Sequence, residues 1–212
     1  MITTIIFDMD GVLLKSIPIH FQAWKRLLTP YFELSREDFN QYIGKSTADT
    51  FSALQKIHGF NLDADDFEKR KDKVYAELTK DIMLYPYVIS VLENLQKTSL
   101  KRGVATSELR EIAHSILKTT DVFKYFSVVV GLDGVLRPKP YPDLFLKAAE
   151  LLGSPAEECL VIEDSPPGIA AAKKAGMFVV AVTNSFARDR LSEADIITDD
   201  LPTTLRELNL YS

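Results

Sequence analysis

The sequence of 212 residues contains only one cysteine, Cys159, and no excess of basic residues. A single cysteine cannot form an internal disulfide, and its place in an apolar run indicates a small core residue rather than a nucleophile. Lysine and arginine total 25 against 30 aspartates and glutamates, a net charge of −5. The cysteine content therefore fits a reducing compartment, and the charge balance gives no reason to expect nucleic acid as a partner.

Long apolar runs, internal repeats and low-complexity segments are also missing. No stretch approaches the length that crosses a bilayer, and no basic run is long enough to suggest binding to a membrane surface. The N-terminus enters a strand at once, so we expect no signal peptide and a cytoplasmic protein without an obligate protein partner. With 46% hydrophobic residues the chain can bury one sizeable core and still carry an inserted subdomain.

The most informative stretch runs from Ile5 to Val12, where an apolar strand leads into two carboxylates. A near-continuous apolar run is typical of a parallel strand buried on both faces, and Gly11 permits a sharp turn after it. In open α/β sheets ligands bind beyond the carboxyl ends of the strands, where Asp8 and Asp10 fall. The pair is either a solvated turn, or a nucleophile and Mg²⁺ ligand beside a general acid/base.

The rest of the chain divides into a helical part and an alternating part. Residues 16–82 are expected to form an inserted, all-helical domain, in which Ser46 and Asp63 stand where helix N-caps are favoured. Residues 1–15 and 83–212 are expected to form one α/β core, a doubly wound, parallel, Rossmann-like sheet. Its expected later strands are 103–105, 126–130, 159–162, 178–182 and 194–197, and its expected helices are 88–95, 108–117, 143–152 and 166–175.

Polar groups of matching kinds follow four of the expected strands. In chain order they are Asp8 with Asp10, then Thr106, then Lys139 in the next loop, then Glu163 with Asp164. Singly, the threonine could be a helix cap, the lysine a solvated loop charge, and the second acid pair caps of the following helix. Together they supply the nucleophile, cation, metal ligands and hydrogen-bond donor that phosphoryl transfer needs.

These motifs resemble those of the haloacid dehalogenase superfamily, and the chain is similar to its β-phosphoglucomutase-like branch. The resemblance covers nearly the whole chain, and it implies that residues 16–82 are a helical cap inserted after the first strand. The matching motifs are Asp8-Met9-Asp10-Gly11-Val12, Thr106, Lys139-Pro140-Tyr141-Pro142-Asp143, and Glu163-Asp164-Ser165 with Gly168.

The resemblance implies which residues act on phosphorus and which hold Mg²⁺. Asp8 would attack the phosphorus atom and become a phosphoaspartate. Asp10 would protonate the leaving oxygen and then activate water, and its backbone carbonyl would bind Mg²⁺. Asp164, with Glu163, would complete the metal site. Dehalogenases of the superfamily lack an acid at position 10, so we do not expect halide displacement.

The resemblance also implies which residues bind substrate. Thr106 and the backbone amide of Ser107 would hold phosphate oxygens, and Lys139 would neutralise charge between the nucleophile and the phosphoryl group. In the cap, the candidate substrate-binding residues are His20, Gly44, Lys45 and Lys71. For the histidine, packing inside the cap remains an alternative, as does a solvated helix face for the last lysine.

Two departures from the mutase pattern bear on the function. Lys15 stands where many relatives have aspartate, and Thr47 stands where the mutase has the arginine that grips the distal phosphate. The sequence therefore predicts a Mg²⁺-dependent phosphatase of a small phosphorylated metabolite, a phosphosugar, that works through a phosphoaspartate. A phosphosugar mutase and a non-enzymatic phospho-accepting domain are the alternatives. The phospho-accepting domain is disfavoured because Asp10 would help water to hydrolyse the phosphoaspartate.

Overall fold

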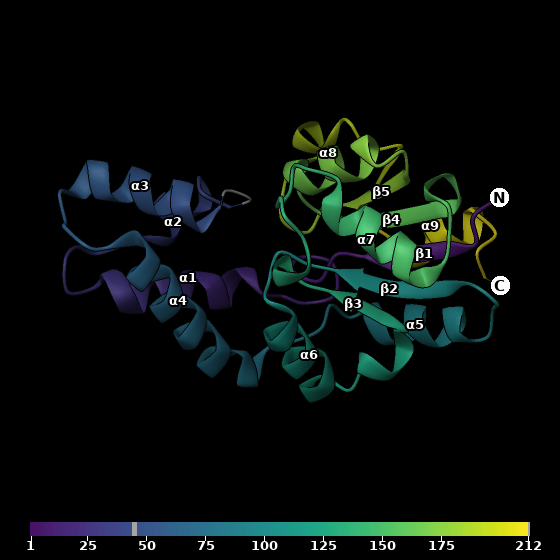
Figure 1. The fold of residues 1–212 in the computed structure, drawn as a ribbon, viewed down its shortest axis with the longest axis horizontal. Helices are drawn as coiled ribbons and strands as arrows, with labels where there is room; N and C mark the ends of the chain where they lie inside the picture. The colour runs from purple at the N-terminus through teal and green to yellow at the C-terminus, as the bar shows by residue number, and fades with distance from the viewer. Residues whose placement is uncertain (44–45, 212) are drawn as a thin grey trace. The chain divides into compact units, whose positions relative to one another are not determined.

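The computed structural model describes residues 1–43 and 46–211. The chain divides into two compact units, a core unit of Met1–Lys15 with Met83–Ser212 and a helical unit of Ser16–Ile82 (Figure 1). None of the helices in the described segments combines the length and the apolar character needed to cross a bilayer.

The core unit is built on a six-stranded parallel sheet, with the order β3-β2-β1-β4-β5-β6 (Figure 1). All residues of its two central strands are buried, which explains why their sequences are apolar except for Thr4 and Glu163. Cys159 begins one of them and is a buried core residue, as predicted. The strands are β1 (Thr4–Phe7), β2 (Lys101–Ala105), β3 (Val128–Val130), β4 (Cys159–Glu163), β5 (Phe178–Val182) and β6 (Ile196–Thr198).

Helices cover both faces of this sheet because the strand order reverses at β1. The chain steps outward from β1 to β3, then returns to β4 and steps outward the other way, and right-handed crossovers place the two sets of helices on opposite faces. This confirms the predicted doubly wound fold, and α7 and α8 pack on one face in a shared apolar cluster. The helices are α5 (Val88–Gln96), α6 (Arg110–Thr119), α7 (Asp143–Leu152), α8 (Pro166–Lys174) and α9 (Leu201–Glu207).

Several element boundaries differ from those expected. The helix expected from residue 108 begins at Arg110, because Leu109 is extended. The strand expected from residue 126 begins at Val128, because the preceding segment forms a short 3₁₀ turn, η2 (Phe123–Tyr125). Helix α9 is not predicted from the sequence, although Asp200 caps it by accepting a hydrogen bond from the amide of Thr203.

The helical unit contains α1 (Ile17–Leu28), α2 (Arg36–Asn40), α3 (Thr47–His58), α4 (Ala64–Leu78) and the 3₁₀ turn η1 (Thr79–Asp81). Ser46 and Asp63 cap α3 and α4, as predicted, by accepting hydrogen bonds from the amides of Asp49 and Asp66. Aromatic rings fill much of its interior, among them Trp24, Phe39, Phe51, Phe60 and Phe67.

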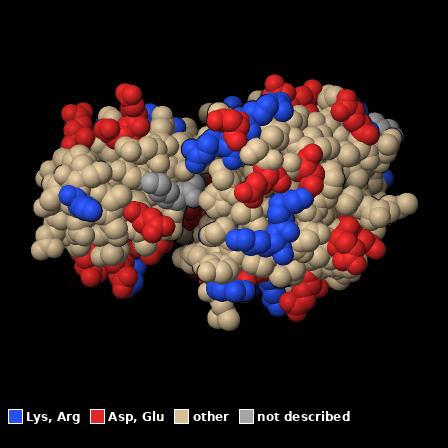
Figure 2. Space-filling model, turned by 90° about the horizontal axis from the view of Figure 1, so that it is seen from above, with Lys and Arg blue, Asp and Glu red and all other residues tan. Residues whose placement is uncertain are grey.

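The segments that flank the helical unit lie side by side within the core unit. The Lys15 amide donates a hydrogen bond to the Met83 carbonyl over 2.8 Å, and Leu14 and Leu84 form an antiparallel bridge. The helical unit is therefore inserted between two chain positions that are already paired. On the surface seen in Figure 2, acidic and basic side chains are interspersed, in keeping with the balanced composition.

Candidate active site

The register of the sheet brings the first acid pair beside the second. Phe7 of β1 is opposite Ile162 of β4, and the Asp8 amide donates a hydrogen bond to the Ile162 carbonyl over 2.9 Å. Asp8 therefore leaves its strand at the same level as Glu163, the last residue of β4. This is the edge where the strand order reverses, and ligands of open α/β sheets bind at such a place.

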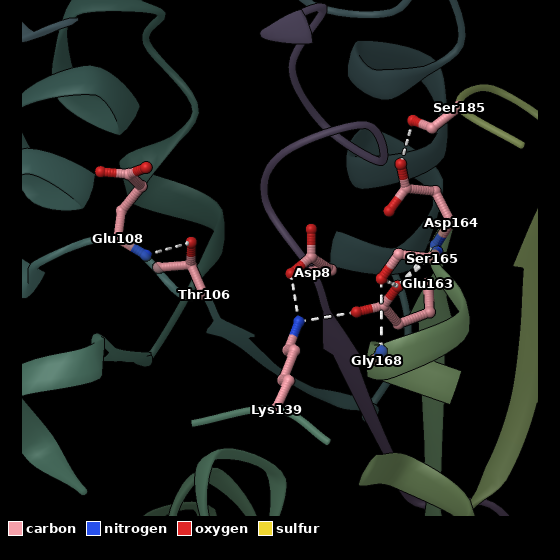
Figure 3. A network of polar contacts seen from close by, with 9 residues as sticks. All are labelled: Asp8, Thr106, Glu108, Lys139, Glu163, Asp164, Ser165, Gly168 and Ser185. Carbon is pink, nitrogen blue, oxygen red and sulfur yellow. Dashed lines mark hydrogen bonds and ion pairs between the residues drawn. The ribbon is translucent and has the colours of Figure 1, made fainter. Parts of the chain in front are cut away.

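Lys139 lies between these two carboxylates. Its Nζ atom donates to Asp8 Oδ1 over 2.5 Å and to Glu163 Oε1 over 2.6 Å (Figure 3). Its side chain is only 7% exposed and stands over the ring of Phe145, with 4.9 Å between Nζ and the ring centroid. The alternative of a solvated loop charge is therefore wrong, since this lysine is a buried cation shared by two acids.

The acids at this edge carry more negative charge than Lys139 neutralises. Burial, and then the carboxylates nearby, raise the pKa of Asp8 well above its ordinary value, while Lys139 opposes that rise. Burial and the neighbouring acids Glu163 and Asp8 likewise raise the pKa of Asp164. Burial alone would lower the pKa of Lys139, but its two carboxylate partners outweigh burial and raise it. The excess negative charge at this site would therefore favour the binding of a further cation.

Glu163 is fixed by hydrogen bonds on both of its oxygens. Besides Lys139 on Oε1, its Oε2 accepts from the backbone amides of Asp164 and Ser165, at 2.7 and 2.8 Å, and from the Ser165 hydroxyl at 2.9 Å. A Cβ atom on Gly168 would lie 1.6 Å from Glu163 Oε1, so only glycine fits there. The N-cap of α8 is Ser165, which accepts from the Gly168 amide, so the acid pair does not cap this helix.

Asp164 packs against the turn that follows β1. Gly11 has φ +81°, and a Cβ atom on it would lie 1.7 Å from Asp164 Oδ2, so both its backbone conformation and this close approach require glycine. The Ser185 hydroxyl forms a hydrogen bond to the same oxygen (Figure 3). Ser185 is not among the residues predicted from the sequence, although it follows β5 at the carboxyl edge of the sheet, as the other site residues follow their strands.

Thr106, Ser107 and Asp10 are also placed at this edge. Thr106 is fully buried, and its hydroxyl accepts a hydrogen bond from the Glu108 amide over 3.1 Å, whereas Ser107 is exposed. Within the described segments, no hydrogen bond joins Thr106 to Asp8 (Figure 3). Asp10 is half-buried and contributes to the raised pKa of Asp8, so its carboxylate lies within electrostatic reach of that residue.

Two candidate substrate-binding residues of the helical unit can be placed within that unit. The His20 ring stacks on Tyr75 with 4.2 Å between centroids. Lys71 is buried, its Nζ donates to Thr47 Oγ1 over 3.3 Å and lies 2.8 Å from Asp72 Oδ1, so the alternative of a solvated helix face is wrong. The other two candidates, Gly44 and Lys45, lie outside the described residues.

The buried acids fit a divalent cation that prefers oxygen ligands. One oxygen each from Asp8, Glu163 and Asp164 lies within 4.8 Å of the others, and all three residues are buried. Three carboxylates beside one lysine leave an excess of negative charge, which a hard cation would neutralise. The donor set therefore has the chemistry of a site for a hard divalent cation.

Comparisons with known proteins agree with this geometry. Residues 5–182 match the family described as haloacid dehalogenase-like hydrolase. The chain is 34% identical over 178 residues to a phosphorylated carbohydrates phosphatase of Thermotoga maritima, a match covering 82% of this chain and 81% of that protein. It is 30% identical over 184 residues to the pyrophosphatase PpaX of Bacillus cereus, covering 86% and 83% respectively.

The fold itself is shared with a solved β-phosphoglucomutase. The structure of that enzyme from Clostridium difficile superposes with a TM-score of 0.83 at 22% identity, covering 99% of this chain and 98% of that one. The chain belongs to the haloacid dehalogenase-like hydrolases. It is a phosphoric monoester hydrolase of this superfamily, and the prediction of the superfamily is confirmed.

Proposed function

We propose that this protein is a Mg²⁺-dependent phosphatase that acts on a small phosphorylated metabolite, a phosphosugar, through a phosphoaspartate at Asp8. The observation that carries the proposal is the buried contact of Asp8 with Lys139, beside Glu163 and Asp164. A carboxylate nucleophile can attack an anionic phosphate only if nearby cations compensate the charge. The relative that is named for phosphorylated carbohydrates supports the choice of a phosphosugar.

In the first half of the proposed reaction, an Asp8 carboxylate oxygen forms a bond to phosphorus and the bond to the ester oxygen breaks. Asp10 gives its proton to that leaving oxygen. Lys139 compensates charge between Asp8 and the phosphoryl group. Mg²⁺, held by Asp8, Asp164 and the Asp10 carbonyl, would neutralise the phosphoryl oxygens. Since Lys139, two backbone amides and a serine hydroxyl occupy the oxygens of Glu163, we assign it to orienting Lys139 and Asp164, while its charge adds to the attraction of the site for a cation.

In the second half, Asp10 takes a proton from water, and the water oxygen attacks phosphorus. The bond between phosphorus and Asp8 breaks, which releases phosphate and restores both carboxyl groups to their starting states. Thr106 and the Ser107 amide would donate hydrogen bonds to phosphoryl oxygens. The Thr106 hydroxyl already accepts a bond from the Glu108 amide, so its own proton is available for donation.

One observation favours hydrolysis over a mutase reaction. A mutase must grip the far phosphate of a bisphosphate, a task that suits the bidentate fork of arginine. The corresponding residue here is Thr47, whose hydroxyl accepts a hydrogen bond from Lys71, and the charge of that lysine is shared with Asp72. We therefore expect water, rather than a second sugar hydroxyl, to take the phosphoryl group.

A panel of phosphate esters tests the proposal. We expect phosphate release from phosphosugars in the presence of Mg²⁺, with loss of turnover after chelation. Pyrophosphate belongs in the panel because a relative is named for it, and preference for it would overturn the phosphosugar assignment. Supplied with β-glucose 1-phosphate and a trace of glucose 1,6-bisphosphate, a mutase would form glucose 6-phosphate faster than inorganic phosphate. Stoichiometric phosphorylation without turnover would instead indicate a phospho-accepting domain.

A further inference from the structure

The turn that carries Asp10 is held from outside by two side chains to which the proposed chemistry assigns no role. Within the turn, the amides of Leu13 and Leu14 both donate to the Met9 carbonyl, at 2.9 and 3.0 Å. These bonds shape the turn, but they leave the carbonyls of Gly11, Val12 and Leu13 to be satisfied by other parts of the chain.

Each of these three successive carbonyls accepts a hydrogen bond from a distant donor. Asn184 Nδ2 donates to the Gly11 carbonyl over 2.7 Å, and the Tyr87 hydroxyl donates to the Val12 carbonyl over 2.6 Å. The Tyr85 amide donates to the Leu13 carbonyl over 3.0 Å. Gly11, Val12 and Leu13 are buried, so water cannot replace these donors without opening the turn.

The two side chains are also bonded to each other. Asn184 Nδ2 donates a second hydrogen bond, to the Tyr87 hydroxyl over 2.9 Å, and that hydroxyl in turn donates its hydrogen bond to the Val12 carbonyl. Every proton of this chain of bonds is used once, and each has one acceptor. Burial raises the pKa of the Tyr87 phenol, so it remains a protonated donor at any working pH of the enzyme.

The same segment reaches the metal-binding acids. Ser185, next to Asn184, bonds to Asp164, and Gly11 lies against that carboxylate so closely that a Cβ atom would overlap it. A shift of the Asp10 turn would therefore move Gly11 into or away from Asp164. The loop after β5 and the residue before α5 thus set the distance between the two acid-bearing turns.

We propose that Tyr87 and Asn184 are positioning residues, which orient Asp10 by holding the Gly11 and Val12 carbonyls of the turn that follows it. The proposal rests on the proposed role of Asp10 as the acid and base of the phosphatase reaction. Neither side chain touches the phosphorus in this scheme. Each acts through the backbone beside the catalytic carboxylate.

The test compares two phosphate esters in the variants Tyr87→Phe and Asn184→Ala. A sugar phosphate has a poor leaving group that needs the proton of Asp10, whereas p-nitrophenyl phosphate has a good one that needs little help. Because general acid catalysis contributes about 10²–10⁴-fold, a partly misplaced Asp10 should cost about 10–30-fold in kcat/KM on the sugar phosphate. On the aryl phosphate we expect kcat/KM to fall by less than about threefold. A general loosening of the fold would lower both values equally.

A second measurement does not depend on activity. Amide hydrogen exchange of residues 11–14 should be faster in both variants, whereas β1 and β4 should exchange as in the wild type. The kcat/KM of the double variant on the sugar phosphate should be only slightly lower than that of either single variant, because the two side chains belong to one hydrogen-bonded chain.

Tyr85→Phe is the matched control. The Tyr85 ring stacks on Tyr87, with 5.7 Å between centroids, and its phenol is within electrostatic reach of Asp164, but among the described residues no side-chain hydrogen bond links its hydroxyl to the Asp10 turn. The control keeps the backbone amide and the ring, and its kcat/KM should stay within about twofold of the wild type.

Failure of this inference can be told apart from failure of the proposed function. If the wild type hydrolyses neither ester, the proposed function is wrong. If the wild type is active but the variants lose equally on both esters, or lose nothing, the positioning role is overturned. Unchanged exchange of residues 11–14 would also overturn it, whatever the activity.

Discussion

The core unit and the helical unit place their charged side chains in opposite ways. The core unit buries Asp8, Glu163 and Asp164 around Lys139 at one edge of its sheet. In the described part of the helical unit, Lys71 is the one buried charged side chain, and aromatic rings occupy the interior. Burying charge is costly unless it is paired, so such a cluster persists where chemistry requires it. This difference supports the proposal that the chemical step belongs to the core unit, and we expect the helical unit to contribute substrate contacts instead.

The sharpest test of this comparison is Asp8→Asn, because the neutral amide neither attacks phosphorus nor binds a cation well. We expect complete loss of phosphate release with an unchanged circular dichroism spectrum. Asp66→Asn is the matched change in the helical unit, where the side chain is exposed and lies 3.7 Å from Arg70. It should leave turnover nearly unchanged. Activity in the first variant would remove Asp8 as the nucleophile.

Substitution of Asp10 should have the next largest effect. Asp10→Asn keeps the backbone carbonyl but removes the ionisable carboxyl group, so we expect kcat to fall about 10²–10⁴-fold at saturating Mg²⁺. A calorimetric titration with Mg²⁺ should give nearly the wild-type affinity for the ion. Weakened Mg²⁺ binding with a normal kcat would contradict the acid/base assignment.

The same substitution, glycine to alanine, can be made once in each unit to compare the two environments. Gly168→Ala places a methyl group against Glu163 Oε1, which is fixed by Lys139, and should lower both the free energy of unfolding, by about 1–3 kcal/mol, and kcat. Gly59→Ala strains a residue at φ +69° with no atom within 4 Å of the new methyl, and should lower stability by about 1–2 kcal/mol without affecting kcat. Chemical denaturation and initial rates distinguish the two outcomes.

The smallest expected effect concerns pH and Mg²⁺. Folding raises the pKa of Asp8 and of Asp164, so the folded state binds more protons than the unfolded state between the unfolded and the folded pKa values. Stability should therefore decrease as pH rises from the unfolded value through the folded one. Mg²⁺ competes with those protons, so it should raise the melting temperature by a few degrees more at pH 8 than at pH 5. Equal shifts at both pH values would argue against a metal site at these acids.

Much of the site could be predicted because parallel strands end at a common edge. Asp8, Thr106 and Glu163 come directly after or at the end of apolar runs. The pattern of apolar residues alone therefore places them at the ends of strands. The sequence could not decide whether Lys139 is solvated, because the residues that bury it, Asp8 and Glu163, are 131 and 24 positions away.

Tyr87 and Asn184, two residues that the sequence does not reveal as important, have a common property. Tyr87 and Asn184 bond to backbone carbonyls 75 and 173 positions away, and a backbone carbonyl gives no signal in the residue types. Lys71 is predicted as a candidate from the resemblance, but it lies in a highly charged helix, so nothing in its spacing indicates that it is buried. Local pattern predicts which edge carries the chemistry, and only the tertiary structure reveals what holds it in place.

The pairing of Lys15 with Met83 has a consequence for how this architecture diversifies. Because the two ends of the insertion are already hydrogen-bonded neighbours, replacing residues 16–82 by a tight turn would close a short loop at little entropic cost. Insertions of other lengths could therefore be accommodated between these paired segments while the strands of the core sheet keep their register. On the proposal that the helical unit contacts the substrate, substrate range and reaction type would reside in separate stretches of the chain.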